Sequence, residues 1–157
     1  MLTLSRTVYI SEARTTLSPE AVTALAAKSA AKNRLIAVSG LLLYSQGNFM
    51  QCLEGEPRAL ELIYHAISAD TRHHRIVRLV DEPTSARLFP NWSMGVLNLD
   101  SESFRLDRQC LLDIIAGTRE IGARARPATV IQLLREFRSQ LPAPAHTPVH
   151  PLALRQA

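Results

Sequence analysis

The side chain with the most unusual surroundings in this 157-residue chain is Gln51. It lies in the stretch NFMQCLEG, residues 48–55, between Phe49 and Leu53. Because side chains alternate along a strand, these three residues point to the same face, and Phe49 and Leu53 favour the core. A buried amide left without partners costs about 1–3 kcal/mol. Gln51 therefore predicts a polar partner, or a polar ligand, within apolar surroundings.

Tyr9 and Asn33 are two further polar residues expected beside the core. Tyr9 lies between Val8 and Ile10 in the stretch VYISEA. Asn33 is the last residue on the inner face of the first expected helix. Singly, each has an ordinary explanation: a core tyrosine, a helix C-cap and, for Gln51, an edge strand facing solvent. Together the three favour a pocket with an apolar body and a few fixed donors and acceptors, as planar cofactors require.

Four other residues are candidates with simpler alternatives. Trp92 and Met94 lie near the last expected strand, where a tryptophan can plug the sheet end and a methionine can fill a gap. Arg72 and His73 belong to DTRH, where the alternative is helix termination with cations near the negative end of the helix dipole. The sequence has no Gly-rich phosphate loop, no GxSxG and no HExxH, and its histidines lack a metal-binding spacing.

Composition narrows the class of protein. A net charge of +4 and a charged fraction of 20% are typical of a soluble globular protein. No basic cluster interleaved with aromatic residues is present, so nucleic-acid binding is not expected. No signal peptide is visible and no apolar run is long enough to span a bilayer. These features predict a cytoplasmic location and no membrane association.

The elements that position these residues follow the order βαββαββ. Alternating and helical patterns predict strands at 2–11, 37–44, 49–55, 75–83 and around 93–97, and helices at 18–33 and 56–70. Right-handed crossovers place both helices on one face of the sheet, which predicts a ferredoxin-like α+β domain. We expect this domain at residues 1–98, two further helices at 99–141 and a flexible Pro-rich tail at 142–157.

These motifs fit a known family. Residues 4–97 resemble the BLUF domain, a blue-light sensor using FAD. The stretches that carry the resemblance are VYISEA, AAKNRLIAVSGLLLYSQGNFMQCLEG, ISADTRH and RLFPNWSMG. One departure is small: the family often has Gly-Ile-Thr-Gly where this chain has Ala-Val-Ser-Gly at residues 37–40.

The resemblance implies how a cofactor binds. It implies non-covalent FAD with its isoalloxazine ring between the two helices, although FMN or riboflavin can replace FAD in a recombinant preparation. Asn33 would bond the polar edge of the ring. Lys32 would approach the phosphate side, and Arg72 and His73 would lie near the flavin, together with Tyr9 and Gln51.

The resemblance also implies a light reaction. Blue light would drive electron and proton transfer from Tyr9 to the flavin. The amide of Gln51 would then rearrange, by rotation or tautomerisation. Trp92 and Met94 would compete for the inward position beside Gln51, so that the last strand carries the change outward.

Our leading hypothesis is therefore a blue-light photoreceptor that is not an enzyme. No cyclase, phosphodiesterase or DNA-binding pattern follows residue 98, so an unidentified partner protein, or a rearranged homo-oligomer, would receive the signal. The alternative is a ferredoxin-like module without photochemistry that binds a small ligand or dimerises. A dimerisation module would pair Tyr9, Asn33 and Gln51 with one another and have no pocket between its helices.

Overall fold

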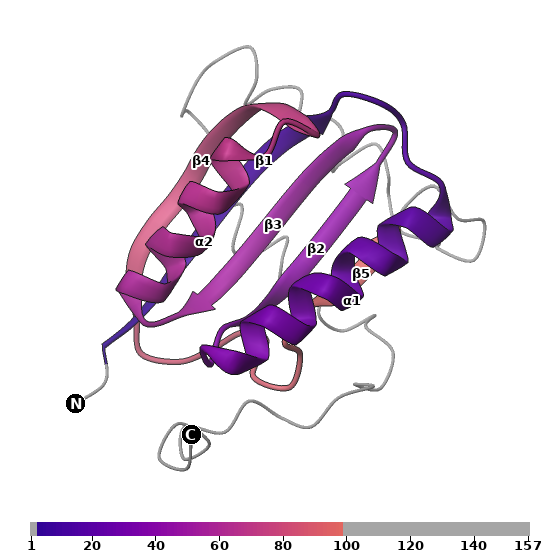
Figure 1. Cartoon of the computed structure of the whole chain (residues 1–157). Helices are drawn as coiled ribbons and strands as arrows, with labels where there is room; N and C mark the ends of the chain where they lie inside the picture. Colours follow the sequence, from indigo (N-terminus) through magenta and orange to yellow (C-terminus); the bar gives the residue numbers. More distant parts are fainter. Residues whose placement is uncertain (1–2, 99–157) are drawn as a thin grey trace.

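We describe the protein from a computed structural model, which places residues 3–98 well enough for description. The expected element order is confirmed (Figure 1). The elements are β1 (Leu4–Ala13), α1 (Pro19–Leu35), β2 (Ser39–Ser45), β3 (Asn48–Gly55), α2 (Pro57–Ala69), β4 (His73–Thr84) and β5 (Gly95–Asn98). Neither of the two helices in this range is long and apolar enough to cross a bilayer. The segments expected at 99–141 and 142–157 lie outside the described residues.

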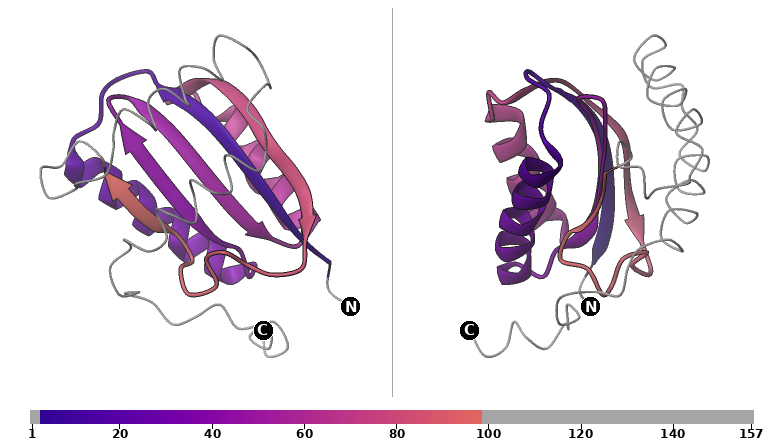
Figure 2. Two further views of the ribbon diagram at one scale, coloured as in Figure 1. Left: turned by 180° about the vertical axis from the view of Figure 1, so that it is seen from behind. Right: turned by 90° about the vertical axis from the view of Figure 1, so that its right-hand side faces the viewer.

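The five strands form one sheet in the order β4-β1-β3-β2-β5. Strand β3 pairs antiparallel with both β1 and β2, and β4 pairs antiparallel with β1. The short β5 pairs parallel with β2 at the edge. Both helices cover the same face of this sheet (Figure 2). The predicted ferredoxin-like α+β fold is therefore confirmed.

Local sequence signals explain how these elements begin and turn. The Ser18 side chain accepts a hydrogen bond from the Ala21 N–H, and Pro19 opens α1. The β2–β3 hairpin turns at Gln46 and Gly47, which both have positive φ, 46° and 81°. Two positive φ values in a two-residue turn match the twist of the flanking strands. This turn fixes the register of β3, which carries Gln51.

Several expected boundaries differ from the observed ones, and three of the differences concern candidate site residues. Helix α1 runs two residues past Asn33, so Asn33 is not a C-cap; the left-handed residue is Ala37, with φ of 53°. The carbonyl of Asn33 accepts the N–H groups of Ile36 and Val38, which closes the helix. His73 begins β4 rather than ending α2, and β5 begins only at Gly95.

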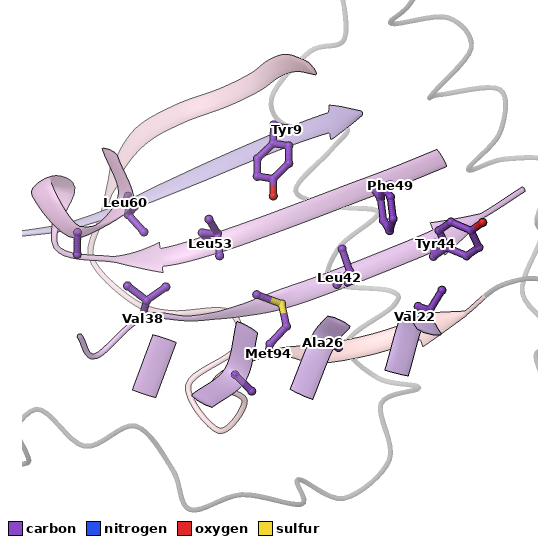
Figure 3. Packing of buried hydrophobic residues seen from close by; sticks show 12 residues of the cluster. Tyr9, Val22, Ala26, Val38, Leu42, Tyr44, Phe49, Leu53, Leu60 and Met94 are labelled. Carbon is purple, nitrogen blue, oxygen red and sulfur yellow. The ribbon is translucent and has the colours of Figure 1, made fainter. Parts of the chain in front are cut away.

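The sheet has a buried apolar cluster on each face. The alternation along β3 separates them: Phe49 and Leu53 belong to the cluster under the helices, and Met50 and Cys52 to the cluster on the other face. Figure 3 shows the first cluster, with side chains from the sheet and from the helices gathered on one face. We call these the helix face and the far face.

Candidate functional site

A cleft of about 580 Å³ lies between the two helices on the helix face. Its floor comes from the sheet, through Tyr9, Ser11, Leu42, Phe49 and Gln51, and its walls come from α1 and α2. Small or apolar residues of the helices, among them Ala21, Ala24, Leu25, Ile63, Ala66 and Ile67, form much of these walls. The cleft thus has an apolar body with polar groups at a few positions.

Tyr9 and Gln51 are direct neighbours on the floor of this cleft. They are paired residues across β1 and β3, and their exposed fractions are only 2% and 6%. Directly opposite residues in an antiparallel pair carry side chains on the same face, close enough to interact. Register therefore brings together two residues that are 42 positions apart in the chain (51 − 9 = 42).

Among residues 3–98, the Gln51 side chain makes one weak hydrogen bond. Its Nε2 donates to the sulfur of Met94 at 3.5 Å. A thioether is a weak acceptor, so this bond holds the amide only loosely. Met94 belongs to the helix-face cluster, where Figure 3 shows its side chain, whereas Trp92 packs against the far-face cluster. The structure thus places Met94, not Trp92, beside Gln51.

Trp92 and Met94 face opposite ways because they precede β5. Residues two positions apart share a face only on a strand. Here the backbone is irregular up to Gly95, and two of its carbonyls are bound: Trp92 O accepts the Gly40 N–H, and Ser93 O accepts Asn33 Nδ2. In this arrangement Met94 occupies the inward position, and the expected competition between the two residues stays a prediction.

Asn33 lines the cleft from α1 and is buried, with 4% of its surface exposed. Its Nδ2 donates to the carbonyl of Ser93 at 2.9 Å. Among residues 3–98, no side-chain hydrogen bond joins Tyr9, Asn33 and Gln51 to one another. The three polar residues therefore meet at a cleft without satisfying each other, contrary to what a dimerisation module predicts.

The remaining predicted residues, Lys32, Arg72 and His73, also line the cleft. The Nε2 of His73 lies 2.8 Å from the carbonyl oxygen of Ile67, and since a carbonyl only accepts, Nε2 is the donor. In a neutral ring Nδ1 is then the acceptor, and it accepts a hydrogen bond from the hydroxyl of Ser11 at 3.0 Å. Arg72 is bound to Asp70, and its hydrogen bonds lower the pKa of Asp70 to about 2.

Several residues near the site were not predicted from the sequence. Ser11 lies two positions after Tyr9 on the same strand, and Lys28 lies one helical turn before Lys32. The period of a strand or helix therefore places each of them on the same face as a predicted site residue. Tyr64 meets the Tyr9 ring edge-on, with centroids 5.8 Å apart. The guanidinium of Arg78 lies 3.7 Å from the centroid of Tyr64.

Burial raises the pKa of the Tyr9 phenol well above its usual value of 10, and Tyr64 raises it further. The stability linked to this proton is fully present below about pH 10. It is lost as the pH rises further, because the unfolded chain then releases a proton that the folded chain retains, at most about 1.4 kcal/mol per pH unit. Urea unfolding between pH 8 and 11 should show this loss in the wild type and a shallower loss in Tyr9→Phe. Equal slopes would contradict it.

The cleft fits a planar cofactor with a polar edge. Its volume lies within the usual range for ligand pockets, roughly 300–1,000 Å³. Tyr9 and Gln51 line this space, and neither the hydroxyl of Tyr9 nor Oε1 of Gln51 has a hydrogen-bond partner among residues 3–98. Such groups need partners, and a ring with donors and acceptors along one edge supplies them.

Comparison with known proteins supports the same conclusion. Residues 4–95 match the BLUF family, described as sensors of blue light using FAD. The photoactivated adenylate cyclase subunit beta of Euglena gracilis is 34% identical over 100 residues, which are 62% of this chain and 12% of that protein. Subunit alpha is 39% identical over 70 residues, 45% of this chain and 7% of the subunit. The chain therefore spans a small part of these relatives.

Solved structures give the same fold. A bacterial light-regulated adenylyl cyclase superposes with a TM-score of 0.68 at 34% identity, over 85% of this chain and 39% of the cyclase. BlrB, a BLUF protein in its dark state, superposes with a TM-score of 0.67 at 28% identity, over 90% of this chain and 99% of BlrB. The cleft, its unpaired polar groups and these matches agree: the chain belongs to the BLUF family of blue-light sensors that bind FAD.

Proposed function

We propose that this protein is a blue-light receptor in which Tyr9 and Gln51 are the photoactive pair. The observation that supports this most directly is their pairing across β1 and β3 on the floor of the cleft. Residues 1–98 would form the sensor domain. A small-ligand module without photochemistry is less well supported, because a tyrosine and an amide held together at a cleft are suited to proton and electron transfer.

The same residues would hold the cofactor. Asn33 has its second amide hydrogen and its Oδ1 left for the polar edge of a bound ring, since Nδ2 gives one hydrogen bond to Ser93. Lys32 brings positive charge to the cleft, where it would attract phosphate groups, and Arg72 lines the same cleft as an ion pair with Asp70. The ring of His73 is held by hydrogen bonds with Ser11 and Ile67. It would line the cleft in a fixed orientation rather than carry a proton.

Tyr9 is suited to give up an electron and a proton together. Its raised pKa keeps the phenol protonated at neutral pH, and burial makes a lone charge on it costly. A bound flavin would supply the absorption of blue light and, once excited, the acceptor for an electron and a proton. In the proposed reaction Tyr9 loses one of each and recovers both on reversal, so the net change is confined to hydrogen bonds.

Gln51 would hold the change in hydrogen bonding that results from this electron and proton transfer. A primary amide has a donor at one end and an acceptor at the other, so turning it exchanges these roles without moving charge. The bond that must break in the protein is the weak one to the Met94 sulfur. Two arrangements of similar energy make a two-state element. Met94 lies next to Gly95, where β5 begins, so its displacement would reach the edge strand.

The output step is part of this proposal. We propose that the chain itself catalyses no reaction and that a separate partner protein, or a second copy of the chain in a homo-oligomer, receives the change. The named relatives are cyclase subunits, and the sequence of this chain contains no cyclase pattern. Pull-downs and size-exclusion runs in the dark and under blue light would identify which route is used.

The whole proposal is tested by absorption spectroscopy of the purified protein. We expect a yellow protein whose released cofactor is FAD, with a visible band that shifts under blue light and returns in the dark. A chain that takes up no flavin would refute the proposal. A chain that binds FAD without any reversible shift would refute its photochemical part.

A further inference from the structure

The segment between β4 and β5, residues 85–94, carries Trp92, Ser93 and Met94, and we call it the edge loop. It contains no helix or strand, yet Leu88, Phe89, Ser93 and Met94 are buried. A loop of this kind needs partners for its backbone groups. Those partners show what fixes the position of Met94.

The first anchor is Glu54, on the far face of β3. Its carboxylate is fully buried, with none of its surface exposed, and does not line the flavin cleft. It accepts the N–H groups of Leu88 and Phe89 at 2.8 and 3.0 Å. It also accepts Nε of Arg6 at 2.9 Å. One carboxylate therefore binds two successive backbone donors of the edge loop and the guanidinium beside them.

Two arginines complete this anchor. Arg6 Nη2 donates to the carbonyl of Ala86 at 3.1 Å. Arg87 donates to the carbonyls of Glu54 and Ala37, each at 2.6 Å, and to the hydroxyl of Ser39. The start of the edge loop is thus bound to β1, to β2 and β3, and to the end of α1. We call this set the Glu54 anchor.

The other end of the loop is held separately. Asn33 in the flavin cleft donates to the carbonyl of Ser93, and Gly40 donates to that of Trp92. A Cβ at Gly40 would lie 2.0 Å from the carbonyl oxygen of Cys52, so only glycine fits at this position of β2 beside β3. Between its two held ends the loop passes from the far face, with Phe89 and Trp92, to the helix face, with Met94.

We propose that Glu54 is a positioning residue that fixes the edge loop, and thereby keeps Trp92 on the far face and Met94 beside Gln51 in the dark. Glutamine keeps one acceptor oxygen and has an NH₂ donor in place of the other, so in Glu54→Gln one of the buried N–H groups of Leu88 and Phe89 loses the oxygen to which it donates. The consequence for signalling rests on the proposed function of Gln51. The dark position of Trp92 does not.

Trp92 is a specific reporter, because it is the sole tryptophan of the chain. The flavin-loaded protein labelled with 5-fluorotryptophan gives one ¹⁹F resonance in the dark. In Glu54→Gln we expect this resonance to move toward that of free fluorotryptophan by more than its linewidth, and its solvent isotope shift in D₂O to grow. FAD content and far-UV circular dichroism should match those of the wild type.

Glu82→Gln is the matched control. The Glu82 carboxylate lies 3.7 Å from Arg6 Nη1, and its side chain is 41% exposed. This change therefore removes a negative charge beside the same arginine and leaves the acceptors of the loop N–H groups in place. Its resonance should coincide with that of the wild type. A Glu54→Gln resonance that also coincides with the wild type would overturn the proposal.

Glu54→Gln leaves the buried Arg6 with only the longer contact to the partly exposed Glu82 as its counter-charge, which can itself prevent folding. The double variant Arg6→Met/Glu54→Gln removes that charge as well, and the same displacement of Trp92 is expected there. An unmoved resonance in the folded double variant would overturn the proposal. Under blue light the wild-type resonance should shift reversibly; if it does not, the proposed function fails, while the dark comparison still decides on the anchor.

Discussion

Replacing Gln51 with leucine should abolish the light-induced absorption shift while leaving FAD bound. Leucine keeps the approximate volume and apolar character of the site, but it offers no donor to Met94 and no acceptor to Tyr9. Because an amide with one weak partner is exchanged for an apolar side chain, the free energy of unfolding should change by no more than about 1 kcal/mol. Absorption spectra before and after blue light, together with FAD content, measure the effect.

Phe49→Leu is the control for this experiment. Phe49 lies two residues away on the same face of β3 and also lines the cleft. Its replacement changes the apolar wall without changing a polar group, so the shift should remain. A Gln51→Leu protein with the shift and dark recovery of the wild type would exclude Gln51 as the moving part.

Replacing Tyr9 with phenylalanine should also remove the light response. A phenyl ring has no hydroxyl proton and is much harder to oxidise than a phenol, so the coupled transfer proposed for Tyr9 has no source. The ring keeps its apolar contacts and its edge-on packing against Tyr64. Since the lost hydroxyl has no partner within residues 3–98, FAD content and thermal stability should stay close to those of the wild type.

Tyr64→Phe separates the two tyrosines. It removes a hydroxyl from the neighbouring ring but keeps the aromatic contact, and Tyr64 does not line the cleft. We expect a light response of wild-type amplitude. Loss of the response in Tyr64→Phe, or its persistence in Tyr9→Phe, would place the electron donor elsewhere. Time-resolved absorption at the flavin band compares the two variants.

Alternation and helical periodicity in the sequence predicted most of the fold and the central residues of the site. Gln51 was expected on the inner face from its neighbours Phe49 and Leu53, and it is there, almost fully buried. Tyr9 and Asn33 were expected at the same pocket, and both line the cleft. These predictions depend only on which face of an element a residue occupies, and the period of a strand or helix fixes that face.

Positions outside regular elements were harder to predict. Trp92 and Met94 were expected near a last strand at about 93–97, but the strand begins at Gly95 and the two side chains lie on opposite faces. Arg78 faces Tyr9 only because the β1–β4 register shifts between Val8 and Tyr9. The Glu54 anchor joins parts of the chain 48 and 34 residues apart, as its hydrogen bonds show. Such pairings depend on tertiary contacts that no local pattern records.

The two-residue turn at Gln46 and Gly47 has a consequence for how this chain can vary. Side chains alternate with a period of two, so inserting or deleting one residue between this turn and Gln51 would move the amide to the far face. Met50 or Cys52 would then take its place on the floor of the cleft. Substitutions along this hairpin keep Gln51 on the helix face, whereas a change in its length by one residue would remove the amide from the cleft and would also turn the buried Glu54 away from the edge loop.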